Sequence, residues 1–225
     1  MWCCAGSAHP TLFLDTPAEK LGEQMSTNYF SAAYTAHAVL RAWLAPSQAN
    51  ATPGQAPRQL VFTSSFIALY TFVGYAPYAP AKAALRSLAD TLSMEVALYA
   101  GTHAPVAVHT LFPATILTAG YEAENRVKSD LTKMLEEDDG GQTADRAAEE
   151  SIKGLEKGDE MIATTWLTRM VMCGVLGGTR RNGWAVVDTG LSWVMSLVMP
   201  YVRYDHEKKV RRWAEKHGPS GMKQQ

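Results

Sequence analysis

Apolar and polar positions follow two different periods along this chain. Four short runs have the length and composition of buried strands: 1–5, 59–65, 106–112 and 161–164. Three longer segments repeat apolar residues at the spacing of an amphipathic helix: 24–44, 78–99 and 143–157. Because helices and strands alternate, the pattern predicts an α/β fold built on a parallel sheet.

Local signals mark where some of these elements begin and end. Thr143 is a suitable N-cap for the helix over 143–157, and Gly158 is typical of a residue that stops a helix. The segment 46–57 is rich in Pro, Ser, Asn, Gln and Gly, so that we predict a surface loop there.

The C-terminal segment departs from an ordinary soluble domain. Residues 184–202 are largely apolar, but their uninterrupted part of about 14 residues is shorter than the ~20 that a spanning helix needs. Aromatic and basic residues accompany this run: Trp184, Trp193, Tyr201, Arg203, Lys208, Lys209, Arg211 and Arg212. They favour a helix in the interface of an anionic membrane leaflet, and a buried helix at an oligomer interface is the alternative. We therefore divide the chain into a domain over 1–165 and a membrane-associating segment over 166–225.

Composition narrows the function classes. With 225 residues, of which 47% are hydrophobic, the chain can bury one sizeable core. A formal net charge of −1 provides no basic field for nucleic acid. Three Cys and six scattered His form neither a disulfide framework nor a set of metal ligands, so that we expect no bound metal.

A tyrosine and a lysine at the start of the 78–99 helix are the strongest candidates for chemistry. Tyr78 and Lys82 are four residues apart, so that on a helix they share one face, one turn from each other. A tyrosine donates a proton near neutral pH only if its pKa falls from about 10, and a neighbouring cation lowers it. Ser65 stands 13 positions upstream, directly after an apolar run, and Asn28 belongs to an earlier predicted helix.

This set of residues resembles the short-chain dehydrogenase/reductase family, in which a strand ending in Ser-Ser is followed by a helix that carries Tyr-x-x-x-Lys. Cys4-Ala5-Gly6 stands where the family has Asn-Ala-Gly, and Phe112-Pro113-Ala114-Thr115 stands where it usually has Pro-Gly. The resemblance covers residues 1–165. It implies a Rossmann-like, doubly wound parallel sheet, followed here by the apolar C-terminal helix.

The resemblance also implies a role for each candidate residue. Tyr78 would give a proton to a ketone oxygen as NADPH delivers hydride, Lys82 would lower the pKa of Tyr78 and bind the nicotinamide ribose, and Ser65 would polarise the ketone. Asn28 would hold a water that links Lys82 to solvent. Since neighbours on a strand point to opposite faces, Ser64 is the alternative to Ser65, and the family spacing favours Ser65.

Two further parts of the site follow from the resemblance. Contacts to NADPH would be completed by residues that follow two of the strands: Ala5, Gly6, Pro113 and Thr115. The segment 121–160, with 13 acidic and 6 basic residues, corresponds to the part that closes over the substrate in the family. A solvated mobile loop is an equal and compatible interpretation of its charge.

Within the family, the sequence is most similar to the fungal 3-ketodihydrosphingosine reductases. The similarity rests on Trp2-Cys3-Cys4-Ala5-Gly6, on the segment 112–125 and on Val202-Arg203-Tyr204-Asp205. It implies NADPH-dependent reduction of a lipid ketone in sphingolipid biosynthesis, at the endoplasmic reticulum membrane with the catalytic domain facing the cytosol. A homo-oligomer is compatible with this, and no nucleic acid partner is expected. The alternatives are a reductase of another hydrophobic ketone, such as a steroid or an acyl intermediate, and a non-catalytic fragment.

One element that the family requires does not occur in these 225 residues. A dinucleotide-binding fold opens with a strand, a glycine-rich turn and a helix whose N-terminus holds the pyrophosphate. The glycines of 174–183 come late and lack that context. We therefore expect that the sequence is truncated at its N-terminus, and that these residues alone neither bind NADPH usefully nor catalyse reduction. If they do bind it, Arg180 and Arg181 are the first candidates for a substitute phosphate site.

Overall fold

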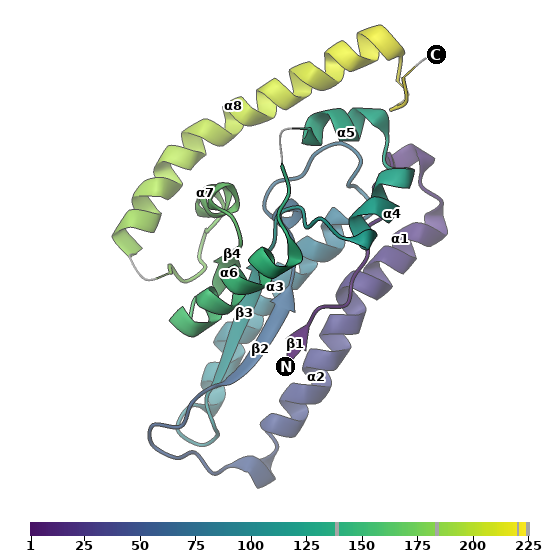
Figure 1. The fold of residues 1–225 in the computed structure, drawn as a ribbon. Coiled ribbons are helices and arrows are strands. Elements are labelled where there is room, and N and C mark those ends of the chain that lie inside the picture. The colour runs from purple at the N-terminus through teal and green to yellow at the C-terminus, as the bar shows by residue number, and fades with distance from the viewer. Residues whose placement is uncertain (138–139, 183–184, 220, 224–225) are drawn as a thin grey trace.

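The computed structural model describes residues 1–137, 140–182, 185–219 and 221–223. Within these residues the strands form one parallel sheet in the order β1-β2-β3-β4, with bounds Trp2–Cys3, Arg58–Thr63, Val106–Phe112 and Met161–Ala163. The helices are α1 Ala18–Met25, α2 Ser31–Trp43, α3 Ala79–Glu95, α4 Ala119–Val127, α5 Asp130–Glu136, α6 Ala144–Lys157, α7 Trp166–Gly174 and α8 Ala185–His217. The parallel α/β fold that the sequence predicts is confirmed (Figure 1).

The two faces of the sheet are covered by different helices, because successive strand residues point to opposite sides. On one face, Leu60 and Phe62 of β2 pack against α2 and α3. On the other face, Val61 belongs to a cluster that Leu155 of α6 covers. Helices on both sides of the sheet make the arrangement doubly wound and Rossmann-like (Figure 1).

The first helical region differs from its prediction. It begins at Ala18 instead of Gln24, because α1 has only eight residues and is mostly polar, so that it adds little to the apolar pattern. Between α1 and α2, Ser26–Phe30 form a π-helical turn. Such wide turns are rare and occur mostly at functional sites. Asn28, at the centre of this turn, is completely buried.

Other elements agree closely with the sequence. β3 has the predicted bounds, 106–112. Thr143 caps α6 by accepting a hydrogen bond from Arg146 N at 3.2 Å. Gly158 ends that helix with a φ of 76°, a conformation that favours glycine. The segment 46–57 is a largely exposed loop with one 3₁₀ turn.

The C-terminal helix α8 has 33 residues and lies across α7 toward α5 (Figure 1). On one side, Met195 is buried in a cluster with α7, and Asp188 forms an ion pair with Arg169 of α7 at 3.0 Å. Large apolar side chains elsewhere on the helix are exposed: Val186, Trp193, Leu197, Tyr201 and Tyr204. By length and composition α8 is able to cross a membrane. Trp184, which the sequence assigns to the same segment, lies outside the described residues.

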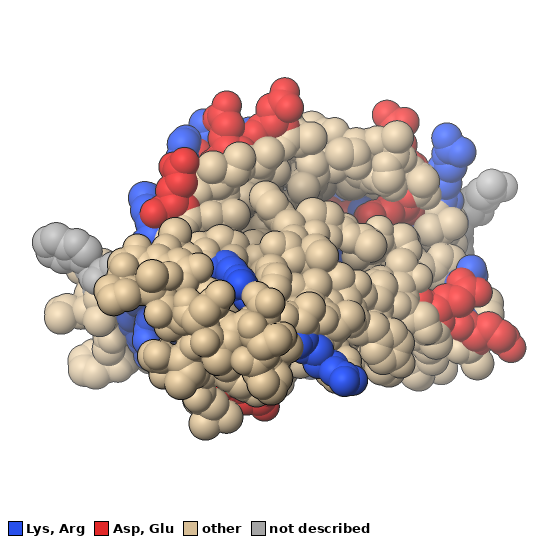
Figure 2. All heavy atoms as spheres, turned by 90° about the horizontal axis from the view of Figure 1, so that it is seen from below, with Lys and Arg blue, Asp and Glu red and all other residues tan. Residues whose placement is uncertain are grey.

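Charge is spread thinly on the face that Figure 2 shows. Most of this face is uncharged, with separate basic and acidic side chains. No continuous basic area covers it, in keeping with the formal net charge of −1.

Candidate active site

Three segments that the sequence singles out follow the carboxyl ends of neighbouring strands. Ala5 and Gly6 follow β1, Ser64 and Ser65 follow β2, and Pro113 follows β3. In a parallel sheet these ends lie along one edge, where α/β proteins bind their ligands. The sheet therefore brings residues from distant parts of the sequence to one place.

Tyr78 and Lys82 lie at the beginning of α3, next to this edge. Tyr78 is the N-cap residue, since α3 begins at Ala79, and Pro80 occupies the first turn, where its missing N–H leaves no helical bond unmade. Lys82, one turn further, is only 3% exposed. Its Nζ lies 5.6 Å from the centre of the Tyr78 ring and donates a hydrogen bond to the carbonyl oxygen of Thr63 at 2.9 Å. The predicted pair therefore lies side by side at the end of β2.

The two serines after β2 have different environments. Ser64 is buried, and its Oγ donates to the carbonyl oxygen of Lys82 at 2.8 Å, which ties the end of β2 to α3. Ser65 is partly exposed and hydrogen-bonds the side chain of Tyr78. Because β2 ends before both serines instead of extending over 59–65, they lie in the connection that follows the strand. Of the two, Ser65 is the one that the structure places with Tyr78.

Asn28 joins the π-helical turn to the segment after β1. Its side chain accepts a hydrogen bond from Ser7 N at 3.0 Å and donates one to Ser7 O at 2.8 Å. Its amide also donates to the carbonyl oxygen of Gln24, four residues earlier, at 3.0 Å. In a regular α-helix the carbonyl oxygen of Gln24 accepts from a backbone N–H. Here the side-chain amide of Asn28 competes for that oxygen, which accounts for the π-helical turn at this position.

Gly6 lies against Asn28 and Lys82 with no room for a side chain. A Cβ atom at Gly6 would lie 2.8 Å from Asn28 Oδ1 and 3.1 Å from Lys82 Nζ. The first distance is shorter than a van der Waals contact, so that any larger residue has to displace the asparagine. The absence of a side chain lets the backbone after β1 approach both polar groups.

The segment after β3 is held by backbone hydrogen bonds to its neighbours. Phe66 N donates to the carbonyl oxygen of Pro113 at 2.9 Å, which ties this segment to the connection after β2. Gln142 N donates to the carbonyl oxygen of Thr115 at 2.9 Å. Thr115 also lies at the wall of a cavity of about 430 Å³, which is bounded by this segment, α4 and α5. Pro113 and Thr115 thus both follow the carboxyl end of β3, and Thr115 lies beside this cavity.

Burial shifts the pKa of both functional groups on α3. It lowers the pKa of Lys82 to about 8, because the charged ammonium is removed from water. It also raises the pKa of the Tyr78 phenol, and the negative charge of Glu124 raises it further, while the hydrogen bond with Ser65 lowers it. The family resemblance implies that Lys82 lowers the pKa of Tyr78. In the structure its ammonium lies over the ring of Tyr78 and donates to Thr63, and the group that lowers the pKa is Ser65.

Charged and aromatic residues of α4, α5 and the segment before α3 also belong to this part of the structure. The family motifs in the sequence did not identify them. Lys128 is buried and forms an ion pair with Glu136 at 2.5 Å. The hydroxyl of Tyr75 donates to the same carboxylate. Glu124, one turn before Lys128, is the residue whose charge acts on Tyr78. The sequence indicated these residues only through the excess of acidic residues in the segment 121–160. That excess does not show which carboxylates face the interior of the protein.

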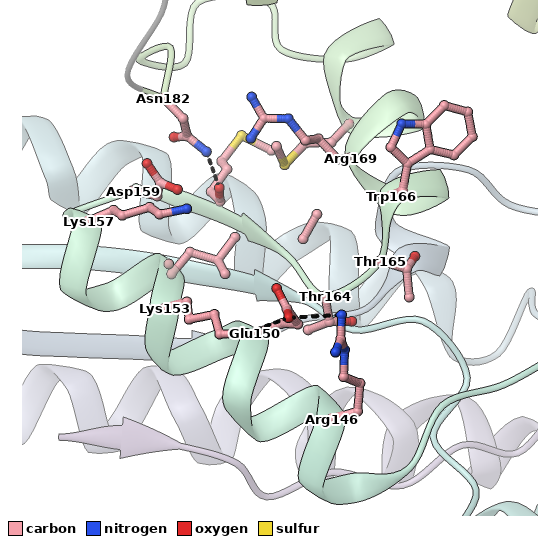
Figure 3. Close-up of a pocket in the computed structure, with 15 residues that line it drawn as sticks. Arg146, Glu150, Lys153, Lys157, Asp159, Thr164, Thr165, Trp166, Arg169 and Asn182 are labelled. Carbon is pink, nitrogen blue, oxygen red and sulfur yellow. Dashed lines mark hydrogen bonds and ion pairs between the residues drawn. The ribbon is translucent and has the colours of Figure 1, made fainter.

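A second cavity lies away from these residues, along β4 between α6 and α7 (Figure 3). It measures about 320 Å³, and charged side chains make up much of its lining. Several of them are already paired: Glu150 with Arg146 at 3.1 Å and with Lys153 at 2.9 Å, and Arg169 with Asp188 at 3.0 Å. No residue of the predicted site lines this cavity, and we assign it no part in the chemistry.

Arg180 and Arg181, the candidates for a substitute phosphate site, lie at the other end of the sheet. Arg180 pairs at 3.3 Å with Glu160, which directly precedes β4, and Arg181 bonds backbone oxygens of its own loop. The amino end of β4 is on the edge opposite to the one that carries Ser65 and Pro113, because all strands are parallel. The two arginines therefore do not complete the site.

The residues at the carboxyl edge fit the nicotinamide half of a dinucleotide. The Lys82 ammonium has three N–H groups and uses one of them on Thr63, which leaves donors for ribose hydroxyls beside the Tyr78 phenol. For the pyrophosphate, the 225 residues contain no glycine-rich turn between a strand and a helix.

Comparison with known proteins agrees with this geometry. The sequence profile of the family described as short chain dehydrogenase matches residues 1–128. The 3-ketodihydrosphingosine reductase of Aspergillus fumigatus is 44% identical over 97% of this chain and 62% of its own length, and that of Neurospora crassa is 40% identical over 97% and 59%. The chain thus spans about three fifths of the length of these curated relatives.

Solved structures share the fold. A short-chain dehydrogenase from Sphingobium yanoikuyae in complex with NADPH has a TM-score of 0.57 at 15% identity, and the match covers 81% of this chain and 66% of that one. A short-chain oxidoreductase from Burkholderia thailandensis has a TM-score of 0.54 at 19% identity, with coverage of 71% and 60%. From the matched profile and the fungal relatives, this chain belongs to the short-chain dehydrogenase family.

Proposed function

We propose that this protein reduces 3-ketodihydrosphingosine to dihydrosphingosine with NADPH. The observation that carries the proposal is the similarity over 97% of the chain to fungal 3-ketodihydrosphingosine reductases, at 44% and 40% identity. The site supports it, because Ser65, Tyr78 and Lys82 converge at the carboxyl edge of the sheet. Since the chain spans about three fifths of those relatives, the activity is proposed for the protein in its natural length.

In the proposed reaction NADPH would supply a hydride to the carbonyl carbon. The residues that would hold it at this edge are Ala5, Gly6, Pro113 and Thr115, with Tyr78 and Lys82. Tyr78 holds a proton on its Oη and transfers it to the carbonyl oxygen, so that the ketone becomes an alcohol and the tyrosine a phenolate. Ser65, which bonds Tyr78 in the structure, donates to the same oxygen and stabilises the negative charge that develops on it.

Lys82 and Asn28 support this centre. With a pKa of about 8, Lys82 is mostly charged at neutral pH, and its ammonium stabilises the phenolate that Tyr78 becomes. Asn28 holds the backbone of Ser7 by two hydrogen bonds, and the neighbouring Gly6 packs against Lys82. These contacts restrict the position of the ammonium relative to the tyrosine.

We also propose that the protein works at the cytosolic surface of the endoplasmic reticulum membrane, with α8 as its anchor. Three large apolar side chains at helical spacing are at least 72% exposed: Trp193, Leu197 and Tyr201. Contiguous exposed apolar surface of this kind is a mark of a membrane or protein contact. Asp188 and Met195 hold α8 to α7, which favours a helix that lies in the interface over one that spans the bilayer. Six basic and three acidic residues between Arg203 and Lys216 suit an anionic leaflet.

The activity is tested with the protein in its natural length, NADPH and 3-ketodihydrosphingosine. Loss of NADPH absorbance and formation of dihydrosphingosine, measured by mass spectrometry, are expected in equal amounts. Tyr78→Phe keeps the ring but removes the transferable proton, and should lower kcat at least about 100-fold. Tyr34→Phe is the matched control, because Tyr34 is 69% exposed on α2. It should leave kcat unchanged.

Two outcomes would contradict the proposal. One is a wild-type protein that oxidises no NADPH with this ketone while it reduces another hydrophobic ketone, such as a steroid. The other is a Tyr78→Phe variant that keeps most of its turnover, which would remove Tyr78 from the role of acid.

A further inference from the structure

Tyr75, in the connection between β2 and α3, holds the backbone at the start of α3. Its carbonyl oxygen accepts hydrogen bonds from Tyr78 N at 3.1 Å and from Ala79 N at 2.8 Å. The N-cap residue of α3, Tyr78, makes no capping hydrogen bond with its own side chain, so that Tyr75 satisfies backbone donors that a capping side chain otherwise takes. The centres of the Tyr75 and Tyr78 rings are also only 6.3 Å apart. The position of Tyr78 therefore depends directly on that of Tyr75.

The side chain of Tyr75 is itself fixed by a contact with α5. It is 8% exposed, and its hydroxyl donates to the carboxylate of Glu136 on α5, whose other oxygen is held by Lys128 at 2.5 Å. Its ring packs edge-to-face on Phe72, with 5.2 Å between the ring centres. A hydrogen bond to a carboxylate is charge-assisted and about twice as strong as one between neutral groups. This bond therefore fixes the Tyr75 side chain relative to α5.

A second contact holds α5 to the same connection. Thr132 of α5 is completely buried, and its hydroxyl donates to the carbonyl oxygen of Val73 at 3.2 Å. Gly74 lies against the same threonine: a Cβ atom at Gly74 would be 2.2 Å from Thr132 Oγ1, and its φ of 95° favours glycine. Val73 and Tyr75, on either side of this glycine, are therefore both bonded to α5.

We propose that Tyr75 is a positioning residue for the reduction, through which α5 sets the place of Tyr78 at the site. The inference rests on the proposed function, since that function assigns to Tyr78 the transfer of a proton to the ketone. Tyr75 acts through Tyr78 and takes no part in the proton transfer itself. Because a displacement of a reacting group by about 1 Å lowers a rate about 100-fold, losing the bond between Tyr75 and Glu136 should slow the chemical step. An interaction that acts only in the transition state changes kcat and leaves KM unchanged.

The test uses the protein in its natural length, with NADPH and 3-ketodihydrosphingosine. Tyr75→Phe keeps the ring and the backbone carbonyl but removes the hydroxyl that binds Glu136. It should lower kcat about 10- to 100-fold and change the KM of both substrates by less than about twofold. Thr132→Val removes the second attachment of the connection, and it should lower kcat by a smaller factor.

Tyr70→Phe is the matched control. The hydroxyl of Tyr70 belongs to the same connection between β2 and α3, but it bonds His206 of α8 at 2.9 Å. Both tyrosine variants lose one hydrogen bond, so that the midpoint of urea unfolding should fall in both. In Tyr70→Phe, however, kcat should stay within about twofold of the wild type. The comparison separates a loss of alignment from a loss of stability.

The acceptor of the Tyr75 hydroxyl is tested from the other side. The double variant Lys128→Met, Glu136→Leu removes the carboxylate together with its ammonium partner, so that no unpaired charge is left in the interior. Its kcat should fall as in Tyr75→Phe. Adding Tyr75→Phe to this double variant should cause no further loss, because both changes remove the same interaction.

Other results contradict the inference. If Tyr75→Phe keeps kcat within about twofold of the wild type while the urea midpoint falls, Tyr75 is structural only. Equal losses of kcat in Tyr70→Phe and Tyr75→Phe, or losses that multiply in the combined variant, would also overturn it. A wild type that reduces another hydrophobic ketone instead refutes the proposed substrate, and the same variants then test Tyr75 with that ketone. If the wild type reduces no ketone, the proposed function fails and this inference fails with it.

Discussion

The carboxyl edge of the sheet and the C-terminal helix α8 differ in the kind of side chain that is out of its usual environment. At the edge, polar groups are inside the protein: Asn28 is 0% exposed and Lys82 3%. On α8, apolar groups are outside: Leu197 is 80% exposed and Trp193 74%. A buried polar group and a large exposed apolar surface each cost free energy in isolation. Each region therefore needs groups that offset this cost, polar ones at the edge and apolar ones at α8.

The two regions differ in how much of that cost the protein itself offsets. At the edge, Asn28 is bonded to Ser7, and Ser64 is bonded to the backbone of Lys82, so that internal contacts set the geometry. The exposed side chains of α8 keep most of their surface in solvent. Chemistry at the edge thus depends on a rigid arrangement, whereas the action of α8 depends on what lies outside it. Variants in the two regions should separate these properties.

Lys82→Met is expected to have the largest effect, with opposite signs for activity and stability. It removes the ammonium that would stabilise the Tyr78 phenolate, so that ketone reduction should fall about 1000-fold. It also removes a buried charge whose pKa is lowered from 10.5 to about 8, a shift that corresponds to about 3 kcal/mol. After the loss of the hydrogen bond to Thr63, the free energy of unfolding at pH 7 should still rise by about 2 kcal/mol. Turnover assays and urea unfolding measure the two effects.

The pH dependence of stability checks the same charge. The folded protein releases the Lys82 proton near pH 8, and the unfolded chain releases it only near 10.5. The unfolded state therefore binds more protons between these values, and Lys82 makes stability rise with pH across this window. In Lys82→Met that contribution disappears, whereas in Lys133→Met, at an exposed lysine, it remains. If the free energy of unfolding changes equally with pH in the wild type, Lys82→Met and Lys133→Met, the interpretation of Lys82 as a buried charge is refuted.

Polar replacements on α8 should have the next largest effect, on membrane binding alone. The triple variant Trp193→Ser, Leu197→Ser, Tyr201→Ser removes exposed apolar surface, so that its affinity for vesicles of anionic phospholipid should fall roughly 100-fold. Flotation of the protein with such vesicles measures this, and the temperature of unfolding should change little. Leu98→Ser, at a residue that is 84% exposed outside α8, should float as the wild type does. If the triple variant floats normally but a wild-type dimer becomes a monomer, α8 is an oligomer interface.

The parts of the structure that the sequence predicted are those whose signals are local. The apolar run 106–112 and the cap at Thr143 depend on neighbouring residues, and both are found as predicted. The pair Tyr78 and Lys82 follows from a spacing of one helical turn. The same holds for the order of the four strands and of α2, α3 and α6, because each of these elements carries its own period.

What the sequence did not reveal depends on contacts between distant residues. The π-helical turn arises because Asn28 bonds Ser7, 21 positions away, as well as its own helix. The carboxylate of Glu136 turns inward because it meets Tyr75, 61 positions away. The acidic excess of the surrounding segment looks the same whether such a side chain faces solvent or the site. Glu136 could therefore be recognised as part of this group only once its contact with Tyr75 was known.

The smallest expected effects come from adding one methyl group in each region. In Gly6→Ala the new Cβ meets Asn28 Oδ1 at 2.8 Å and Lys82 Nζ at 3.1 Å, so that these groups must move and the free energy of unfolding should fall by about 1–3 kcal/mol. In Gly190→Ala, on α8, the Cβ meets nothing within 4 Å. Because alanine favours a helix more than glycine does, the free energy of unfolding should rise by about 0.5–1 kcal/mol. Urea unfolding of both variants measures the difference, and a neutral Gly6→Ala would show that the edge is not as tightly packed as the structure indicates.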